Sequence, residues 1–167
     1  MKKILSLTLA LAMLGTALTG CGSKTAAPET SVEPTQQTAP YQQEQSQTEK
    51  ALALINTFAT GDTDTARSLL SDGYIQHNLA YGTGADAFIG SVEYLASADV
   101  KTTVNNIRAF EDGDKVFLQT IYNFAGAGEQ VAFDIFRFDE DGKIAEHWDV
   151  METIADKSTW QNENGKF

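Results

Sequence analysis

The sequence predicts an α+β fold in which helices come first and a curved antiparallel sheet packs against them. Apolar residues recur at helical spacing between residues 46 and 97, and from about residue 101 the apolar period changes to two. Three short loops that contain glycine, "EDGD", "GAG" and "DEDG", separate the later segments and suit β-hairpins. Helices followed by an antiparallel meander place the helices on one face of the sheet.

Capping and stop signals predict where the helices begin and end. Ser46 and Glu49 form a capping-box pattern at the start of the first helix, and Gly61 ends it. Asp62 or Thr63 can cap a short second helix. We expect this second helix to end at Leu70 and "GYIQHN" to follow as an irregular or extended segment. The remaining expected elements are a third helix over 85–97 and strands over 101–110, 115–125, 129–138 and 143–151.

The N-terminus has the layout of a secretory signal peptide. Two lysines precede an uncharged apolar stretch over residues 4–18, which is shorter than the roughly 20 residues of a membrane-spanning helix. The residues "LTGC", ending at Cys21, resemble a bacterial lipobox. The resemblance implies removal of residues 1–20 and attachment of diacylglycerol to the Cys21 sulfur. The alternative is an ordinary secretory signal followed by an incidental cysteine.

We therefore expect an extracytoplasmic protein that is anchored to the bacterial cell membrane by lipid on Cys21. Two or more acyl chains, such as palmitate, suffice for stable anchoring. Cys21 is the only cysteine, so no internal disulfide is possible. Residues 21–45 contain all three prolines and little to bury, which predicts a flexible linker. Residues 46–167 are long enough for one domain.

Charge and motifs narrow the class of function. The formal net charge is −11 and no lysine–arginine cluster occurs, so a nucleic-acid partner is not expected. The sequence contains no dinucleotide fingerprint, phosphate loop or serine-hydrolase elbow. Two histidines and one cysteine, which we expect to be lipidated, are too few ligands for a typical zinc site, and "DEDGK" has too few oxygen ligands for calcium. We expect neither a metal nor another cofactor.

Several motifs resemble a known family. "YIQHN" after two helices, the strand "DGDKVFLQTIY", the hairpin "VAFDIFRFDEDGKIAEHWDVME" and the closing "NENGKF" are similar to the SnoaL-like branch of the nuclear-transport-factor-2-like superfamily. The similarity spans nearly all of residues 50–167 and is most specific in the hairpin. Leu79 stands where many relatives carry proline.

This resemblance implies a cone-shaped sheet closed by the three N-terminal helices, as in the nuclear-transport-factor-2-like and cystatin-like folds. It also implies a small-molecule pocket inside the cone and a homodimer formed through the sheet. Relatives include polyketide cyclases, ketosteroid isomerases, scytalone dehydratases and limonene epoxide hydrolases, which use acid/base side chains without metal. Others have no catalytic role, so the fold does not decide the function. At the pocket mouth the resemblance places Tyr74, His77 and Asn78 as hydrogen-bond donors.

The last predicted strand carries "EHWDV", the most reactive combination of side chains in the chain. Alternation puts His147 and Asp149 on one face and Trp148 on the other. If "DEDG" closes a two-residue hairpin loop, Asp134 lies directly opposite His147. If Gly142 instead makes a three-residue loop with a bulge, the pairing slips by one residue and Asp134 moves to the Trp148 face. We prefer the first register.

A face with carboxylates and an imidazole inside an apolar hollow suits proton transfer. Burial raises the pKa of a carboxylate toward neutrality, and histidine titrates close to neutrality. We expect Asp149 or Asp134 to act as the base, with His147 as its partner or as the acid. Tyr122 on the neighbouring strand offers a phenol, and Phe136 lies on the same face. These residues predict a lyase, isomerase or cyclase-like enzyme that acts on a small apolar or carbonyl compound.

Two alternatives need no catalysis. A buried pair of Asp and His is often a structural hydrogen bond, because buried polar groups must be paired. The protein would then be a lipoprotein whose pocket binds a small ligand or whose sheet docks a partner. Trp148 is expected in the core or at a dimer interface in either case.

Overall fold

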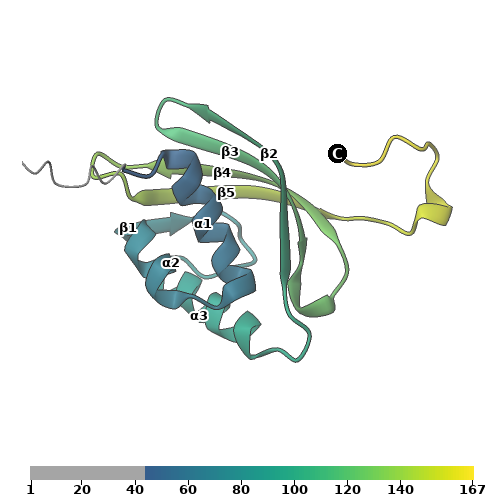
Figure 1. Ribbon diagram of the computed structural model, residues 1–167, viewed down its shortest axis with the longest axis horizontal. Coiled ribbons are helices and arrows are strands. Elements are labelled where there is room, and N and C mark those ends of the chain that lie inside the picture. Colours follow the sequence, from purple (N-terminus) through teal and green to yellow (C-terminus); the bar gives the residue numbers. More distant parts are fainter. Residues whose placement is uncertain (1–43) are drawn as a thin grey trace, which may run out of the picture. The chain divides into compact units, whose positions relative to one another are not determined.

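The computed structural model describes residues 44–167, and Figure 1 shows them as a curved sheet with three helices gathered on one of its faces. This arrangement confirms the predicted α+β class. The elements are α1 (Gln47–Thr60), α2 (Thr63–Leu69), β1 (Leu70–Gln76), α3 (Ala85–Ser97), β2 (Thr103–Asp112), β3 (Lys115–Asn123), η1 (Phe124–Gly126), β4 (Gln130–Phe138), β5 (Ile144–Thr153) and η2 (Lys157–Thr159).

The expected signal peptide, Cys21 and most of the linker lie outside the described residues. Within residues 44–167, no helix combines the length and the apolar character that crossing a membrane requires.

The first helix begins and ends as predicted. The Ser46 hydroxyl accepts a hydrogen bond from the backbone N–H of Glu49 at 3.1 Å, and the Glu49 carboxylate accepts from the backbone N–H of Ser46 at 2.8 Å. Gly61 ends the helix with φ 74°, and its N–H donates to the Thr57 carbonyl at 2.8 Å. A Cβ at this position would come within 2.8 Å of the Ala96 Cβ, so the close approach of α3 also requires glycine.

The other two helices also match their predicted ranges closely. Of the two candidate caps for α2, Asp62 is the one used, because its carboxylate accepts from the backbone N–H of Thr65 at 2.9 Å. The bounds of α3 coincide with the predicted 85–97. Its apolar stripe buries Phe88, Ile89 and Val92 in the core between the helices and the sheet.

The sheet is mixed and not wholly antiparallel. Its strand order is β1-β5-β4-β3-β2, in which β1 runs parallel to β5 and all other neighbours are antiparallel. The prediction of an antiparallel sheet is therefore wrong at the β1 edge. A parallel neighbour that lies far along the chain leaves no hairpin loop in the sequence to reveal it. Of "GYIQHN", the residues up to Gln76 belong to β1, and His77 and Asn78 follow it.

The β4–β5 register differs from both predicted registers. Asp134 pairs with Asp149 and Phe136 pairs with His147, so the preferred pairing of Asp134 with His147 is wrong by two residues. Two irregularities each shift the pairing by one residue. The first is a three-residue loop, in which Gly142 has φ 68° and the Asp139 N–H donates to the Lys143 carbonyl.

The second irregularity is a bulge beside Phe138. Phe138 pairs with Ile144, whereas Arg137 pairs with Glu146, so Ala145 is the extra residue on β5. Ile144 and Ala145 are accordingly both buried, although they are consecutive. Because two single shifts restore the original alternation, Asp134 stays on the same face as His147 and Asp149.

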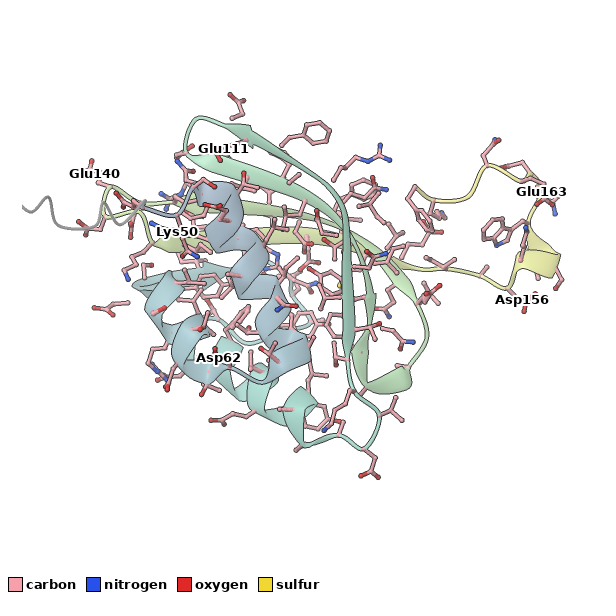
Figure 2. All side chains as sticks on the ribbon, in the orientation of Figure 1. Lys50, Asp62, Glu111, Glu140, Asp156 and Glu163 are labelled. Carbon is pink, nitrogen blue, oxygen red and sulfur yellow. The ribbon has the colours of Figure 1, made fainter. Side chains whose placement is uncertain are left out.

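The start of α1 is tied to two hairpin turns at one end of the sheet. Figure 2 shows Glu111 and Glu140 at these turns, with Lys50 on α1 close by. The Glu111 carboxylate accepts from the Thr48 hydroxyl at 2.8 Å, and the Lys50 ammonium donates to the Gly142 carbonyl at 3.0 Å. These contacts hold α1 across the inner face of the sheet and close this end of the core.

The C-terminal segment beyond β5 runs out past the sheet before it returns, and Figure 2 labels Asp156 and Glu163 on it. Its return is fixed by the Gln119 amide, which donates to the Lys166 carbonyl at 2.8 Å. Gln119 lies on the face of the sheet that points away from the helices, which we call the outer face. The segment therefore covers part of this outer face and leaves the space under the helices untouched.

Candidate functional site

A cavity of about 490 Å³ lies between the helices and the inner face of the sheet. Small-molecule sites in proteins commonly have volumes of this order and are mostly apolar with a few convergent polar groups. Here the polar groups come from β1, β3, β4 and β5, and the helices supply apolar walls. Six of the predicted site residues line the cavity: Tyr74, Tyr122, Asp134, Phe136, His147 and Asp149.

His147 and Asp134 form the buried centre of this polar group. The His147 Nε2 lies 3.1 Å from the Asp134 Oδ1, and the Tyr122 hydroxyl donates to the Asp134 Oδ2 at 3.0 Å. His147 also stacks on Phe136 with ring centroids 4.4 Å apart. His147 and Asp134 are diagonal and not direct neighbours across the strands, and diagonal positions remain within reach of long side chains.

Gln76 determines which nitrogen of His147 carries the proton. The backbone N–H of Asn78 donates to the Gln76 Oε1 at 2.9 Å, so the amide must turn its NH₂ group the other way. That NH₂ group lies 2.9 Å from the His147 Nδ1, which therefore acts as an acceptor. The ring proton is then on Nε2 and is donated to Asp134. The contacts of Gln76 and Asp134 therefore hold the imidazole ring in one orientation.

Replacing Gln76 by Glu should place a proton on the His147 Nδ1, because a carboxylate there can only accept. Ring ¹⁵N NMR of histidine reports this directly, and the His77→Asn variant identifies which signals belong to His147. We expect Nδ1 to be unprotonated in the wild type and protonated in Gln76→Glu. An already protonated Nδ1 in the wild type would show that Gln76 does not set the tautomer.

Asp149 is the less satisfied of the two carboxylates. Its side chain is only 4% exposed. The Oδ1 accepts from the Asn78 amide at 2.6 Å, whereas the Oδ2 lies 3.9 Å from the His147 Nε2, which is too far for a hydrogen bond. Burial raises the pKa of Asp149, and the nearby charge of Asp134 raises it further, against the opposing effects of His147 and Asn78.

Tyr74 supplies a proton donor beside these carboxylates. Burial, with the charges of Asp149 and Asp134, raises the pKa of Tyr74 well above its ordinary value, so its phenol stays protonated. The Tyr74 oxygen receives a long contact of 3.5 Å from the Gln76 amide. Within residues 44–167 the phenol proton has no acceptor at hydrogen-bond distance. It is therefore available to a ligand in the cavity.

His77 does not line the cavity, although the resemblance placed it at the pocket mouth. It lies on the outer face, where its ring stacks on Trp148 with centroids 4.4 Å apart and its Nε2 lies 2.9 Å from the Glu146 carboxylate. Arg137 donates to the same carboxylate at 2.6 Å, and His77 and Arg137 together lower the pKa of Glu146. Alternation explains the placement, because Gln76 pairs with the inward His147 and its neighbour must face outward.

Asn78 lies beside the cavity wall and acts through Asp149. Gln76 was not predicted as a site residue, although it pairs with His147 in the sheet and contacts its ring. Tyr81 and Tyr94 also line the cavity, are more than half exposed, and were not predicted either. The only sequence signal for Gln76 was that it is polar and directly precedes the predicted site residue His77.

The cavity contains a group of side chains close enough together to be tested as metal ligands. One ligand atom each of Asp134, His147 and Asp149 lies within 4.8 Å of the others. A metal on the His147 Nε2 would require the ring proton on Nδ1. That position faces the NH₂ group of Gln76, which is itself a donor. Histidines that bind metals normally donate their second N–H to an acceptor. The group therefore suits proton transfer better than metal binding.

Comparison with known proteins gives a family and a fold. The family described as "SnoaL-like domain" matches residues 51–147. Among curated proteins, none matches the sequence. Three solved structures that match this chain have sequence identities below 25%, so their likeness concerns the fold alone.

These three structures illustrate the likeness. An NTF2-like protein of unknown function from Cytophaga hutchinsonii has a TM-score of 0.57 at 16% identity, over 66% of this chain and 94% of its own. An LEH-like epoxide hydrolase of M. tuberculosis has a TM-score of 0.54 at 18% identity, over 62% of this chain and 80% of its own. IdmH from Streptomyces antibioticus, a candidate polyketide cyclase, has a TM-score of 0.52 at 18% identity, over 65% of this chain and 93% of its own.

Proposed function

Because the chain belongs to the SnoaL-like domain family, we propose that its cavity is an acid/base active site for a small carbonyl compound. The reaction would be of the lyase, isomerase or cyclase type and would need no cofactor. One observation carries this proposal: the Asp149 carboxylate lines the cavity with little exposure, has a raised pKa, and has an Oδ2 without a hydrogen-bond donor among residues 44–167. A desolvated carboxylate of this kind is a stronger base than one in water.

In the proposed reaction, the Asp149 Oδ2 removes a proton from the carbon next to the substrate carbonyl. Charge then develops on the carbonyl oxygen, and the Tyr74 phenol donates a hydrogen bond to it. The His147 Nε2–H donates to Asp134. It therefore does not compete with the substrate for the Asp149 Oδ2. The same Asp149 can return its proton to another carbon, which gives isomerisation, or assist loss of a hydroxyl, which gives dehydration.

The experiment that tests this proposal needs no knowledge of the natural substrate. Proton abstraction next to a carbonyl exchanges hydrogen for deuterium in D₂O, and proton NMR follows the loss of the signal. We expect the protein to accelerate exchange at the α-carbon of 2-tetralone, a neutral ring ketone of suitable size. Tight binding of ring ketones without any accelerated exchange would contradict catalysis.

A non-catalytic binding role is the second candidate. The aromatic residues around the cavity favour it, because they would bind a flat apolar ligand without any chemistry. Phe58, Phe88 and Phe124 form part of this wall. The exchange experiment separates the two roles, since a binding protein shifts the ligand signals and leaves its α-protons in place.

We also propose that the protein forms a homodimer through the outer face of its sheet. Phe110 pairs with Phe117, and Phe133 pairs with Val150, and all four side chains are at least 39% exposed. Exposed apolar side chains grouped on one face of a sheet are of the kind that marks interaction sites. A two-fold dimer would bring the same surface of both copies together.

Replacing Phe133 by Glu should convert this dimer into a monomer, because a carboxylate would be buried without a partner. Analytical ultracentrifugation measures the change. Leu79→Glu is the matched control, since Leu79 is fully exposed in a loop away from the sheet. A wild type that sediments as a monomer at micromolar concentration would rule out this interface.

Finally, we propose that the mature protein is lipid-anchored through Cys21 on the extracytoplasmic side of the bacterial membrane. The sequence motif before Cys21 supports this proposal. Metabolic labelling with palmitate should mark the wild type, whereas Cys21→Ser should be unlabelled and released from the membrane fraction. A Cys21→Ser variant that stays membrane-bound would point to anchoring by an uncleaved signal.

A further inference from the structure

The cavity is lined by acidic groups without any compensating basic side chain. Among the described residues that line it, none is lysine or arginine, and its carboxylates are Asp134 and Asp149. His147 lies between them, with the Gln76 amide at its Nδ1 and Asp134 at its Nε2. The charge that lysine, arginine and acidic side chains contribute to the cavity lining is therefore negative.

Eight of the nine lysine and arginine side chains in residues 44–167 contact backbone carbonyls or carboxylates outside the cavity: Lys50 with Gly142, Arg67 with Asp86, Lys101 with Ala96 and Ala98, Lys115 with Asp114, Arg137 with Glu146, Lys143 with Ser68, Lys157 with Glu163, and Lys166 with Glu152. The ninth, Arg108, is exposed on β2 and does not line the cavity. None of these contacts brings a positive charge to Asp149.

The two carboxylates are unequally satisfied. Asp134 receives hydrogen bonds on both oxygens, from His147 and from Tyr122. Asp149 receives one, from Asn78, and its Oδ2 has no donor within hydrogen-bond distance among residues 44–167. A buried carboxylate is costly unless it is paired and hydrogen-bonded. A ligand group that carries a positive charge and N–H donors would complement the Asp149 Oδ2.

Aromatic rings surround the same space. Tyr122 and Phe124 stack with centroids 4.9 Å apart, and Phe58 packs edge-on against both. Tyr74 and Phe136 complete the wall next to the carboxylates. Electron-rich ring faces attract a desolvated cation, and aromatic side chains combined with a carboxylate are a recurrent means of binding ammonium groups.

We propose that this cavity binds a protonated organic amine that carries a ring, with its ammonium group at the Asp149 Oδ2 and its ring among the aromatic side chains. This recognition goes beyond the proposed acid/base reaction, because it requires the charge of Asp149 and no turnover. An amine seated there would also occupy the proposed base, so it would compete with a carbonyl substrate.

Three ligands with the same ring and different charge test this inference. They are 2-naphthylmethylamine, which is a cation at neutral pH, 2-naphthalenemethanol, which is neutral, and 2-naphthoate, which is an anion. Calorimetry on the full chain in detergent should give an affinity for the amine that is on the order of tenfold higher than for the alcohol. The carboxylate should bind most weakly. An alcohol that binds as tightly as the amine would overturn the inference.

Variants identify the group responsible. Asp149→Asn should remove most of the preference for the amine and leave the affinity for the alcohol nearly unchanged. Glu152→Gln is the control, because Glu152 is a carboxylate on the same strand that pairs with Lys166 outside the cavity. An amine preference that survives Asp149→Asn would contradict the assignment. If that variant does not fold by near-UV circular dichroism, the charge series on the wild type decides alone.

This result is independent of the proposed reaction. Charge-selective binding without exchange of α-protons would support amine recognition and contradict catalysis. Exchange without any preference for the amine would support catalysis and overturn amine recognition.

Discussion

Replacing Asp149 by Asn should lower kcat/KM for α-proton exchange by about 10²–10⁴-fold, the usual contribution of a general base. Asn has nearly the same shape and can still accept the hydrogen bond from Asn78, so the cavity should keep its geometry. It cannot accept a proton from carbon. Proton NMR in D₂O with 2-tetralone measures the rate for both proteins, and equal rates would show that Asp149 is not the base.

The stability of the same variant provides its control. The pKa of Asp149 is raised in the folded protein, so the fold favours the protonated carboxyl and loses stability as pH rises above the ordinary pKa of 3.8. At neutral pH, Asp149→Asn should therefore be at least as stable as the wild type. Chemical unfolding at neutral and acidic pH should show a gain that shrinks as pH falls. A variant that is less active only because it is unfolded would fail this control.

The second large effect is expected in the core beneath the site. Phe136 is 1% exposed and stacks on the His147 ring, so Phe136→Ala removes a large apolar group and leaves a void. Such changes cost about 3–5 kcal/mol of unfolding free energy. Chemical denaturation measures this loss. Tyr94→Ala is the matched control, because Tyr94 is 74% exposed on α3 and its loss should change stability by about 0.5 kcal/mol or less.

Equal losses for Phe136→Ala and Tyr94→Ala would contradict the packing described here. If Phe136→Ala is too unstable to purify, Phe136→Leu retains most of the apolar volume and should lose less. The His147 ring would still lack its stacking partner in that variant, which ring NMR can report.

Local signals in the sequence were sufficient for most of the fold. The capping box at Ser46, the left-handed stop at Gly61 and the apolar spacing of 85–97 each act within a few residues, so the helix bounds followed directly. The pairing of β2 with β3, β3 with β4 and β4 with β5 could also be predicted locally, because each turn joins two strands that are consecutive in the sequence. The parallel strand β1 was missed as a sheet member because its partner β5 lies about seventy residues away.

The candidate site depended on register, which is harder to predict. The face shared by Asp134, His147 and Asp149 was expected correctly, although each of the two registers considered was wrong. The reason is that the three-residue loop and the bulge at Ala145 cancel in their effect on alternation. The family resemblance placed His77 at the pocket, whereas the structure places Gln76 there and His77 on the outer face. Neighbouring residues of a strand face opposite sides, so a resemblance without a known register could not decide between them.

Titration of the aspartate carboxyl carbons by ¹³C NMR tests most directly whether Asp149 is a desolvated carboxylate with a raised pKa. The comparison of wild type with Asp149→Asn assigns its signal without any substrate. We predict that the signal missing from the variant titrates in the wild type at a pH above the ordinary pKa of 3.8. A signal that titrates at or below that value would place Asp149 in contact with water and contradict the proposed active site.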